Sequence, residues 1–245
     1  MEHDDVQVGR LLTRREALAL IGVSGTAILT GSRSAAGTAA DSRSQLPSCV
    51  VRPQQTEGPY FVDERLNRSD IRSDPVSGAV KAGVPLVLLF SVSRVTGGAC
   101  TRLVGAQVDI WHCDALGVYS DVTDPGFSTI GEKFLRGYQV TDAMGMARFT
   151  TIYPGWYQGR TVHIHFKTRT NQSPVQGYEV TSQLYFDDSL TDRVHALPPY
   201  ASKGRRTLRN SGDRIFLRGG QQLMLAPTAG DHGHVATFDI GLRIA

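Results

Sequence analysis

Apolar and polar residues alternate along most of the chain beyond residue 40, with the period of two that is typical of β-strands. In residues 106–113, for example, Val108 and Ile110 fall on one face of an extended chain and Asp109 falls on the other. Strands are predicted at residues 85–95, 106–113, 147–153, 161–170, 179–186, 214–217, 222–225 and 234–244.

The spacing of these strands predicts the fold class. Several short strands are separated by turns that contain glycine or proline, and no long segment of 3.6-residue period follows residue 40. We therefore expect an all-β, single-domain β-sandwich with long irregular loops and few or no helices. Residues 188–213 are rich in Pro, Arg and Ser and are long for a loop, so we expect them to pack over the sandwich as irregular structure.

Residues 1–40 have the pattern of an export signal. Arg14 and Arg15 precede an apolar run at residues 19–29, which is shorter than the ~20 residues that span a bilayer. Small residues at positions 34–40 suit a signal-peptidase site. This order is typical of a twin-arginine signal, and an N-terminal anchor helix is the less favoured alternative. We expect the translocase of that pathway to be a partner during export, and the domain of residues 41–245 to reach the periplasm or the outside of the cell.

Composition narrows the classes of partner. The formal net charge of +3 is weak, and part of it lies in the signal segment. The chain has no run of lysine and arginine interleaved with aromatic residues, so nucleic acid is not an expected partner. It has no second apolar segment long enough to span a bilayer, so no membrane span is expected after signal cleavage.

The chain contains three cysteines, Cys49, Cys100 and Cys113. In an oxidising compartment one pair is expected to form a disulfide, and we favour Cys49–Cys100 because both residues lie in predicted loops near strand starts. On the chain-entropy model, closing this loop stabilises the fold by roughly 4 kcal/mol. Cys113 lies in a strand-like run and is predicted to be a buried free thiol.

The first candidate for chemistry is the pair His163 and His165. In an extended strand both side chains project from one face, while Val162, Ile164 and Phe166 project from the other face and supply a core. A strand that presents two neighbouring imidazoles is a suitable platform for a metal. The pair alone is a weak signal, because many histidines on strands are structural, solvated or merely hydrogen-bonded.

Two tyrosines strengthen the metal hypothesis. Tyr119 follows a glycine turn just past a predicted strand, and Tyr157 lies six residues before His163. A phenolate is a hard, strongly donating oxygen ligand that suits Fe(III). Bound iron would deprotonate tyrosines whose ordinary pKa is about 10. Two tyrosines and two histidines therefore form a chemically coherent set of iron ligands.

Six short motifs resemble those of one enzyme family. They are QTEGPY at 55–60, RSDI at 68–71, DIWHCD with GVYS at 109–120, TIYPGWY at 151–157, RTVHIHF at 160–166 and TSQLYF at 181–186. Together they resemble the intradiol ring-cleavage dioxygenases, the superfamily of catechol 1,2- and protocatechuate 3,4-dioxygenases. The resemblance covers residues 49–242 approximately, and the joint occurrence of two tyrosines, an arginine and His-x-His makes it specific.

The resemblance implies a β-sandwich enzyme with one non-haem Fe(III) per chain. The implied ligands are Tyr119, Tyr157, His163 and His165. The implied reaction uses O2 to cleave a catechol-type diol between its two hydroxylated carbons, which gives a cis,cis-muconate-type dicarboxylate. The metal in such a site acts as a Lewis acid and a template.

The resemblance also implies roles for neighbouring residues. Tyr157 would leave the iron and accept a substrate proton. Arg160 would bind the substrate and stabilise negative charge, and a salt bridge at the edge of the sandwich is the less favoured alternative for it. Gln183 would support Arg160 or the rearrangement. Tyr60 would line the substrate pocket, and a packed aromatic is the equal alternative. The segment between Tyr157 and His163 is shorter than in the cytoplasmic catechol and protocatechuate enzymes, which implies a more open substrate mouth.

Two other classes of protein compete with this interpretation. Cupins also use His-x-His, but they need a glutamate a few residues later, and residues 167–171 (KTRTN) contain none. A secreted β-sandwich that binds a metal or a carbohydrate without catalysis remains the alternative. Such a module would have no use for the paired tyrosines.

Overall fold

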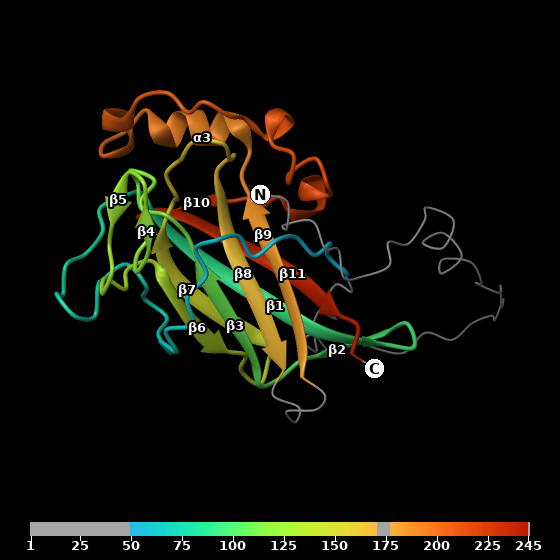
Figure 1. The fold of residues 1–245 in the computed structure, drawn as a ribbon. Coiled ribbons are helices and arrows are strands. Elements are labelled where there is room, and N and C mark those ends of the chain that lie inside the picture. Colours follow the sequence, from blue (N-terminus) through green and yellow to red (C-terminus); the bar gives the residue numbers. More distant parts are fainter. Residues whose placement is uncertain (1–49, 171–176, 245) are drawn as a thin grey trace, which may run out of the picture.

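Two large β-sheets form most of the described part of the chain, and the predicted all-β sandwich is confirmed (Figure 1). A computed structural model describes residues 50–170 and 177–244. The predicted export signal and Cys49 therefore lie outside the described residues. No helix of the described ranges is long and apolar enough to cross a membrane.

The larger sheet is built around the longest strand. It contains β1 (Pro85–Thr96), β2 (Ala99–Arg102), β7 (Met146–Ile152), β10 (Thr228–Gly230) and β11 (Gly233–Leu242). Strand β1 pairs in parallel with β11 and antiparallel with both β2 and β7. This sheet forms the rear layer in Figure 1.

The smaller sheet has four strands, all antiparallel to their neighbours. In order across the sheet they are β6 (Arg136–Val140), β3 (Ala106–Trp111), β8 (His163–Thr170) and β9 (Tyr178–Tyr185). Two strands of two residues each, β4 (Thr123–Asp124) and β5 (Phe127–Ser128), pair with each other. They lie beyond one end of this sheet in Figure 1.

The hydrophobic core lies between the two sheets. Phe166 of β8 packs against Phe90 of β1 and Phe238 of β11, and both ring-centroid distances are 5.5 Å. Ile164 and Phe166 are fully buried in this core. Because side chains alternate along β8, the opposite set of residues on that strand faces away from the core.

The order of the elements corrects several predicted boundaries. The strands predicted at 85–95, 106–113, 147–153, 161–170, 179–186 and 234–244 are present within two residues or so at each end. The predictions at 214–217 and 222–225 were wrong, since these residues form turns and a 3₁₀ helix at Gly220–Leu223. Strands β2, β4, β5, β6 and β10 were not predicted.

The segment 188–213, predicted to be irregular, begins with a helix. Helix α3 (Asp188–His195) is capped by Asp187, whose carboxylate accepts hydrogen bonds from the N–H groups of Ser189 and Leu190. Two 3₁₀ helices follow, at Tyr200–Lys203 and Asn210–Gly212. This cap satisfies backbone N–H groups that have no partner in the first turn of the helix, and it thereby stabilises a helix of only eight residues.

Residues 53–63, which we call the N-terminal strap, cross the outer face of the smaller sheet (blue in Figure 1). The strap is held on edge strand β9, where Gln55 N–H donates to the Thr181 carbonyl at 3.0 Å. The Ser182 hydroxyl donates to the Pro53 carbonyl at 2.7 Å. The strap therefore covers the face of the sheet that the core does not use.

The cysteines differ in state. Cys113 is a buried free thiol, as predicted. Cys100 is disulfide-bonded. Because Cys49 lies outside the described residues, its pairing with Cys100 stays a prediction.

Candidate metal centre

The outer face of the smaller sheet presents the histidine pair. His163 and His165 alternate with the core residues Ile164 and Phe166, as the sequence predicted. In the register of the sheet, His165 lies opposite Trp111 on one side and Gln183 on the other. The two imidazoles are thus fixed on a central strand with neighbours on both sides.

The four predicted ligands lie together. The Nε2 atoms of His163 and His165 are 3.0 Å apart, and the hydroxyl of Tyr157 is 3.2 Å from His163 Nε2. The Tyr119 ring lies 5.7 Å from the Tyr157 ring and 6.3 Å from the His165 ring, between centroids. Ligands that each lie about 2.1 Å from one metal at right angles are separated by about 3 Å, so these donor atoms are spaced to share a metal.

Two close approaches bring the tyrosine-bearing loops together. Gly117, at φ +81°, packs against the Trp156 backbone, and Gly155 packs against the backbone of Ala115. A Cβ atom at either glycine would collide with these carbonyl groups. Only glycine allows such contact, and Tyr119 and Tyr157 follow each by two residues.

A tyrosine oxygen at this place has no partner. Among the described residues, the buried Tyr119 hydroxyl is one of eight buried side-chain atoms without a hydrogen-bond partner. The described ranges also contain no group of three or more His, Cys, Asp or Glu side chains that could hold a metal. A metal at this point therefore needs the tyrosine oxygens as ligands, and the residues fit a hard, trivalent cation.

Burial sets the protonation of the four groups. It lowers the pKa of His163 and His165 well below the usual value, with a smaller contribution from the charge of Arg160. Both imidazoles are therefore neutral, which is the form that binds metals. Burial raises the pKa of Tyr119 and Tyr157 well above the usual value, so these phenols lose their protons only to a strong cation.

The two histidines are oriented by different means. Nδ1 of His163 lies 2.7 Å from the Thr161 carbonyl, so Nδ1 carries the proton and Nε2 is free to bind a metal. His165 is instead held by packing. Its ring stacks on the Trp111 ring, with 4.9 Å between the centroids and an angle of 8° between the planes. Gly58 lies beside the Cε1 and Nε2 atoms of the same ring.

Tyr60 contacts a predicted ligand. Its ring stacks on Tyr119 with centroids 4.4 Å apart, and its hydroxyl donates to Asp124 Oδ2 at 2.6 Å. Burial, followed by the Asp124 carboxylate, raises the pKa of Tyr60 to about 12. Tyr60 therefore joins the N-terminal strap to the β4–β5 pair across the face of Tyr119.

Arg160 and Gln183 form one hydrogen-bonded group. Arg160 Nη2 donates to Gln183 Oε1 at 2.6 Å, and Gln183 Nε2 donates to the Thr56 carbonyl of the strap at 2.9 Å. Arg160 Nε donates to Asp213 Oδ2 at 2.8 Å. The positive charge of Arg160 also acts to lower the pKa of Tyr157, against the larger effect of burial.

Sequence reasoning missed Asp213, Trp111 and Gly58 as members of this site. Asp213 lies in a stretch that reads as a loop, and nothing local indicates that it meets Arg160. The alternation of apolar and polar residues at 106–113 does place Trp111 on the face that points away from the core, and this pattern could have indicated that Trp111 lies near the histidines. Its contact with His165 depends on strand register, which the sequence does not specify by itself.

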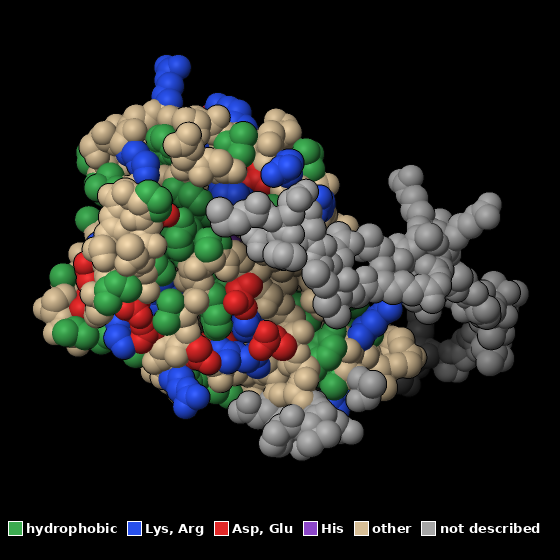
Figure 2. All heavy atoms as spheres, viewed as in Figure 1, with side chains coloured by type: hydrophobic (Ala, Val, Ile, Leu, Met, Phe, Trp, Pro, Cys, Tyr) green, Lys and Arg blue, Asp and Glu red, His purple; other side chains and the backbone are tan. Residues whose placement is uncertain are grey.

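The same face becomes ionic beyond the histidines. Lys167 pairs with Glu57 and with Glu179, the latter at 2.8 Å. Arg169 pairs with Asp109 at 2.8 Å and with Asp63 at 2.9 Å. Figure 2 shows acidic and basic side chains mixed on the lower part of this face. Lys167 and Arg169 thus each have two carboxylates of the chain beside them.

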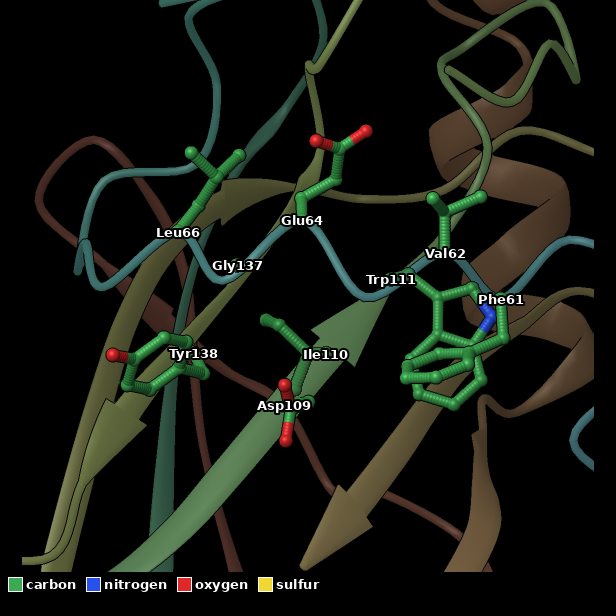
Figure 3. Close-up of a pocket in the computed structure, with 9 residues that line it drawn as sticks. All are labelled: Phe61, Val62, Glu64, Leu66, Asp109, Ile110, Trp111, Gly137 and Tyr138. Carbon is green, nitrogen blue, oxygen red and sulfur yellow. The ribbon is translucent and has the colours of Figure 1, made fainter. Parts of the chain in front are cut away.

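A shallow hollow lies beside the centre (Figure 3). Its free volume is about 10 Å³, which is room for about one water molecule. Trp111 and Phe61 lie together on one side of it, and Asp109 and Tyr138 lie on the other. None of the four predicted ligands lines it. The hollow is too small for an aromatic substrate.

Comparisons with known proteins all find similarity to dioxygenases. Residues 56–201 match the family model described as "Dioxygenase". The chain is 29% identical over 170 residues to chlorocatechol 1,2-dioxygenase of Pseudomonas putida, which covers 58% of each chain. It is 31% identical over 167 residues to the protocatechuate 3,4-dioxygenase beta chain of Burkholderia cepacia, with 63% of this chain and 69% of that one covered.

Solved structures extend the likeness to the fold. An intradiol ring-cleavage dioxygenase from Tetranychus urticae matches with a TM-score of 0.69 and 28% sequence identity. The match covers 80% of this chain and 95% of that one. By contrast, the chain spans little more than half the length of the chlorocatechol dioxygenase it matches.

Proposed function

Because the chain belongs to the intradiol ring-cleavage dioxygenase family, we propose that it cleaves a catechol-type diol with O2, using one non-haem Fe(III). The proposed ligands are Tyr119, Tyr157, His163 and His165. The carbon–carbon bond between the two hydroxylated carbons breaks, and both oxygen atoms of O2 enter the product. One diol and one O2 thus give one cis,cis-muconate-type dicarboxylate.

One observation carries this proposal. His163 Nε2 lies 3.0 Å from His165 Nε2 and 3.2 Å from the Tyr157 hydroxyl, and the ring of the buried second tyrosine, Tyr119, lies beside that of Tyr157. Buried polar atoms without hydrogen-bond or charged partners are unfavourable, and binding of a cation by these atoms would stabilise the arrangement. The donor set of two tyrosines and two neutral histidines favours Fe(III) over Zn²⁺ or Mg²⁺.

The protein residues then have defined tasks. Bound Fe(III) would supply Lewis-acid activation of the diol towards O2. The phenol oxygen of Tyr157 holds a proton taken from a substrate hydroxyl, a task that its raised pKa favours. The Arg160 guanidinium, held beside Tyr157, stabilises negative charge on the substrate. Gln183 positions that guanidinium through the hydrogen bond to Nη2.

We also propose that the protein is exported. The twin-arginine pattern at Arg14 and Arg15 supports delivery to the periplasm or the outside of the cell, with the translocase as a partner during export. Replacing both arginines with lysine should retain the protein in the cytoplasm, as cell fractionation would measure. Export at the unchanged rate would contradict this assignment.

Iron content, colour and product analysis test the activity. The purified protein should contain one iron per chain and have a red-brown visible absorption that shifts when catechol is added without O2. With O2, a panel of catechol, protocatechuate and hydroxyquinol should reveal a substrate by oxygen uptake. Two labelled atoms from ¹⁸O₂ should appear in the product. A colourless protein that takes up no iron and consumes no O2 would refute the proposal in favour of a binding module.

A further inference from the structure

We propose that Asp213 is a positioning residue that holds Arg160 in its working orientation. This inference rests on the proposed function and adds a residue that lies beyond the matched stretch 56–201. Asp213 is 1% exposed, and it follows a 3₁₀ helix in the segment above the sandwich. It reaches the centre from a part of the chain that supplies none of the proposed ligands.

Asp213 supplies the counter-charge of Arg160. The Arg160 side chain is 15% exposed and the Asp213 side chain is 1% exposed, with 2.8 Å between Nε and Oδ2. A largely buried guanidinium without a counter-charge is strongly unfavourable. Asp213 is the carboxylate that forms an ion pair with Arg160 among the described residues. Burial acts to raise the pKa of Asp213, but Arg160 and the backbone N–H groups of Thr161 and Phe216 outweigh it, so the carboxylate stays ionised.

Two acceptors fix the orientation of the Arg160 guanidinium. Asp213 takes the Nε of Arg160, and Gln183 takes the Nη2. A planar guanidinium held at two of its nitrogens has a fixed plane, and Nη1 takes part in neither bond. Lysine could not make this arrangement, since its ammonium is a point charge on a flexible chain.

Asp213 is itself held in place by backbone N–H groups. Its Oδ1 accepts the N–H groups of Ile215 and Phe216 at 2.7 and 3.0 Å. Its Oδ2 also accepts the Thr161 N–H at 2.8 Å. A carboxylate that accepts four hydrogen bonds is held in one position, and it therefore holds the Arg160 guanidinium in one position as well. A displacement of about 1 Å in a catalytic group can slow catalysis by about 100-fold.

Asp213→Asn is the central variant, and Asp192→Asn is its control. Asp192 lies in the same segment and pairs with Arg206 and Arg209, so it tests the loss of a carboxylate away from the centre. We expect Asp213→Asn to keep its iron and visible absorption, to bind catechol without O2 within about 3-fold of the parent, and to lose kcat by about 10- to 100-fold. Asp192→Asn should keep kcat within about 2-fold.

A double-variant cycle shows whether Asp213 acts through Arg160. Arg160→Ala should retain iron and turn over slowly, and adding Asp213→Asn should slow it no further. Losses that multiply, an unchanged kcat in Asp213→Asn, or iron loss in proportion to activity would each overturn the inference. Arg160→Lys decides the case if Asp213→Asn does not fold, because it leaves the Asp213 carboxylate in place. A normal kcat in Arg160→Lys would show that charge suffices without a fixed plane.

Failure of the proposed function is recognised separately. It would appear in the parent protein as absence of iron, colour and oxygen uptake, before any variant is compared. A parent that cleaves catechol beside an equally fast Asp213→Asn variant would overturn the role of Asp213 alone.

Discussion

Along the outer face of β8, the two ends of the strand are polar in different ways. At one end, Lys167 and Arg169 each lie between carboxylates of the same chain. At the other end, His163 and His165 direct their Nε2 atoms at each other, and the Tyr119 hydroxyl has no partner among the described residues. Buried polar groups in stable folds are satisfied. The ionic end therefore balances its charges within the chain, whereas the imidazole end carries the proposed metal ligands.

Removing a proposed ligand should have the largest effect. Tyr119→Phe keeps the ring and its stacking but deletes the oxygen, so the visible absorption should bleach or shift. The value of kcat/KM should fall by at least ~100-fold, since even outer partners of a metal site contribute 10- to 100-fold. Tyr138→Phe, on the same sheet beside Asp109, is the control and should behave as the parent. Full activity in Tyr119→Phe would refute its assignment as a ligand.

Disturbing the packing of His165 should have an intermediate effect. A Cβ at Gly58 would lie 3.2 Å from His165 Cε1, and the φ of Gly58 is +73°. We expect Gly58→Ala to weaken iron binding by about 10- to 100-fold. Gly78→Ala is a matched control, because Gly78 has a φ of +74° and nothing within 4 Å of the added atom.

The glycine pair separates strain from contact. Both variants should lower the free energy of unfolding by ~1 kcal/mol or more through backbone strain, as urea denaturation would measure. Only Gly58→Ala should change iron affinity in a competition titration with a chelator. Equal iron affinities in the two variants would show that packing does not position His165.

Changing the ionic end should have the smallest effect on the metal. Lys167→Met removes a cation whose side chain is 6% exposed but whose partners Glu57 and Glu179 are 40% and 51% exposed. We expect the free energy of unfolding to fall by about 1 kcal/mol, because half-exposed partners are screened by water. Iron content and colour should be unchanged. Loss of iron would show that the two ends of β8 depend on each other.

The face of β8 could be predicted because it depends on local chemistry. Alternation of His163, Ile164, His165 and Phe166 requires only that the strand forms, and the apolar members ensure that it does. The turn glycines before Tyr119 and Tyr157 are equally local signals. The resemblance of six motifs then placed these segments in one site, and their convergence agrees with it.

Residues 188–225 could not be predicted because side chains there override the pattern. Asp187 caps a helix where an irregular segment was expected. Asp213 draws the N–H groups of Ile215 and Phe216 into a turn where a strand was expected. Such local side-chain bonds compete with sheet formation and leave no period in the sequence. The contacts of Trp111 with His165 and of Asp213 with Arg160 are tertiary, so they depend on the completed fold.

The N-terminal strap has a consequence for the order of folding. Thr56 meets Gln183 across a sequence separation of 127 residues, and Gln55 meets Tyr185 across 130. Contacts between residues so far apart in the sequence require a long loop to close, which has an entropic cost, and such contacts form slowly. A growing chain could not close the centre until β9 and the segment that carries Asp213 had also been synthesised. Iron capture is thus expected late, and on refolding the visible absorption should develop in the slowest phase, after the sheets have formed.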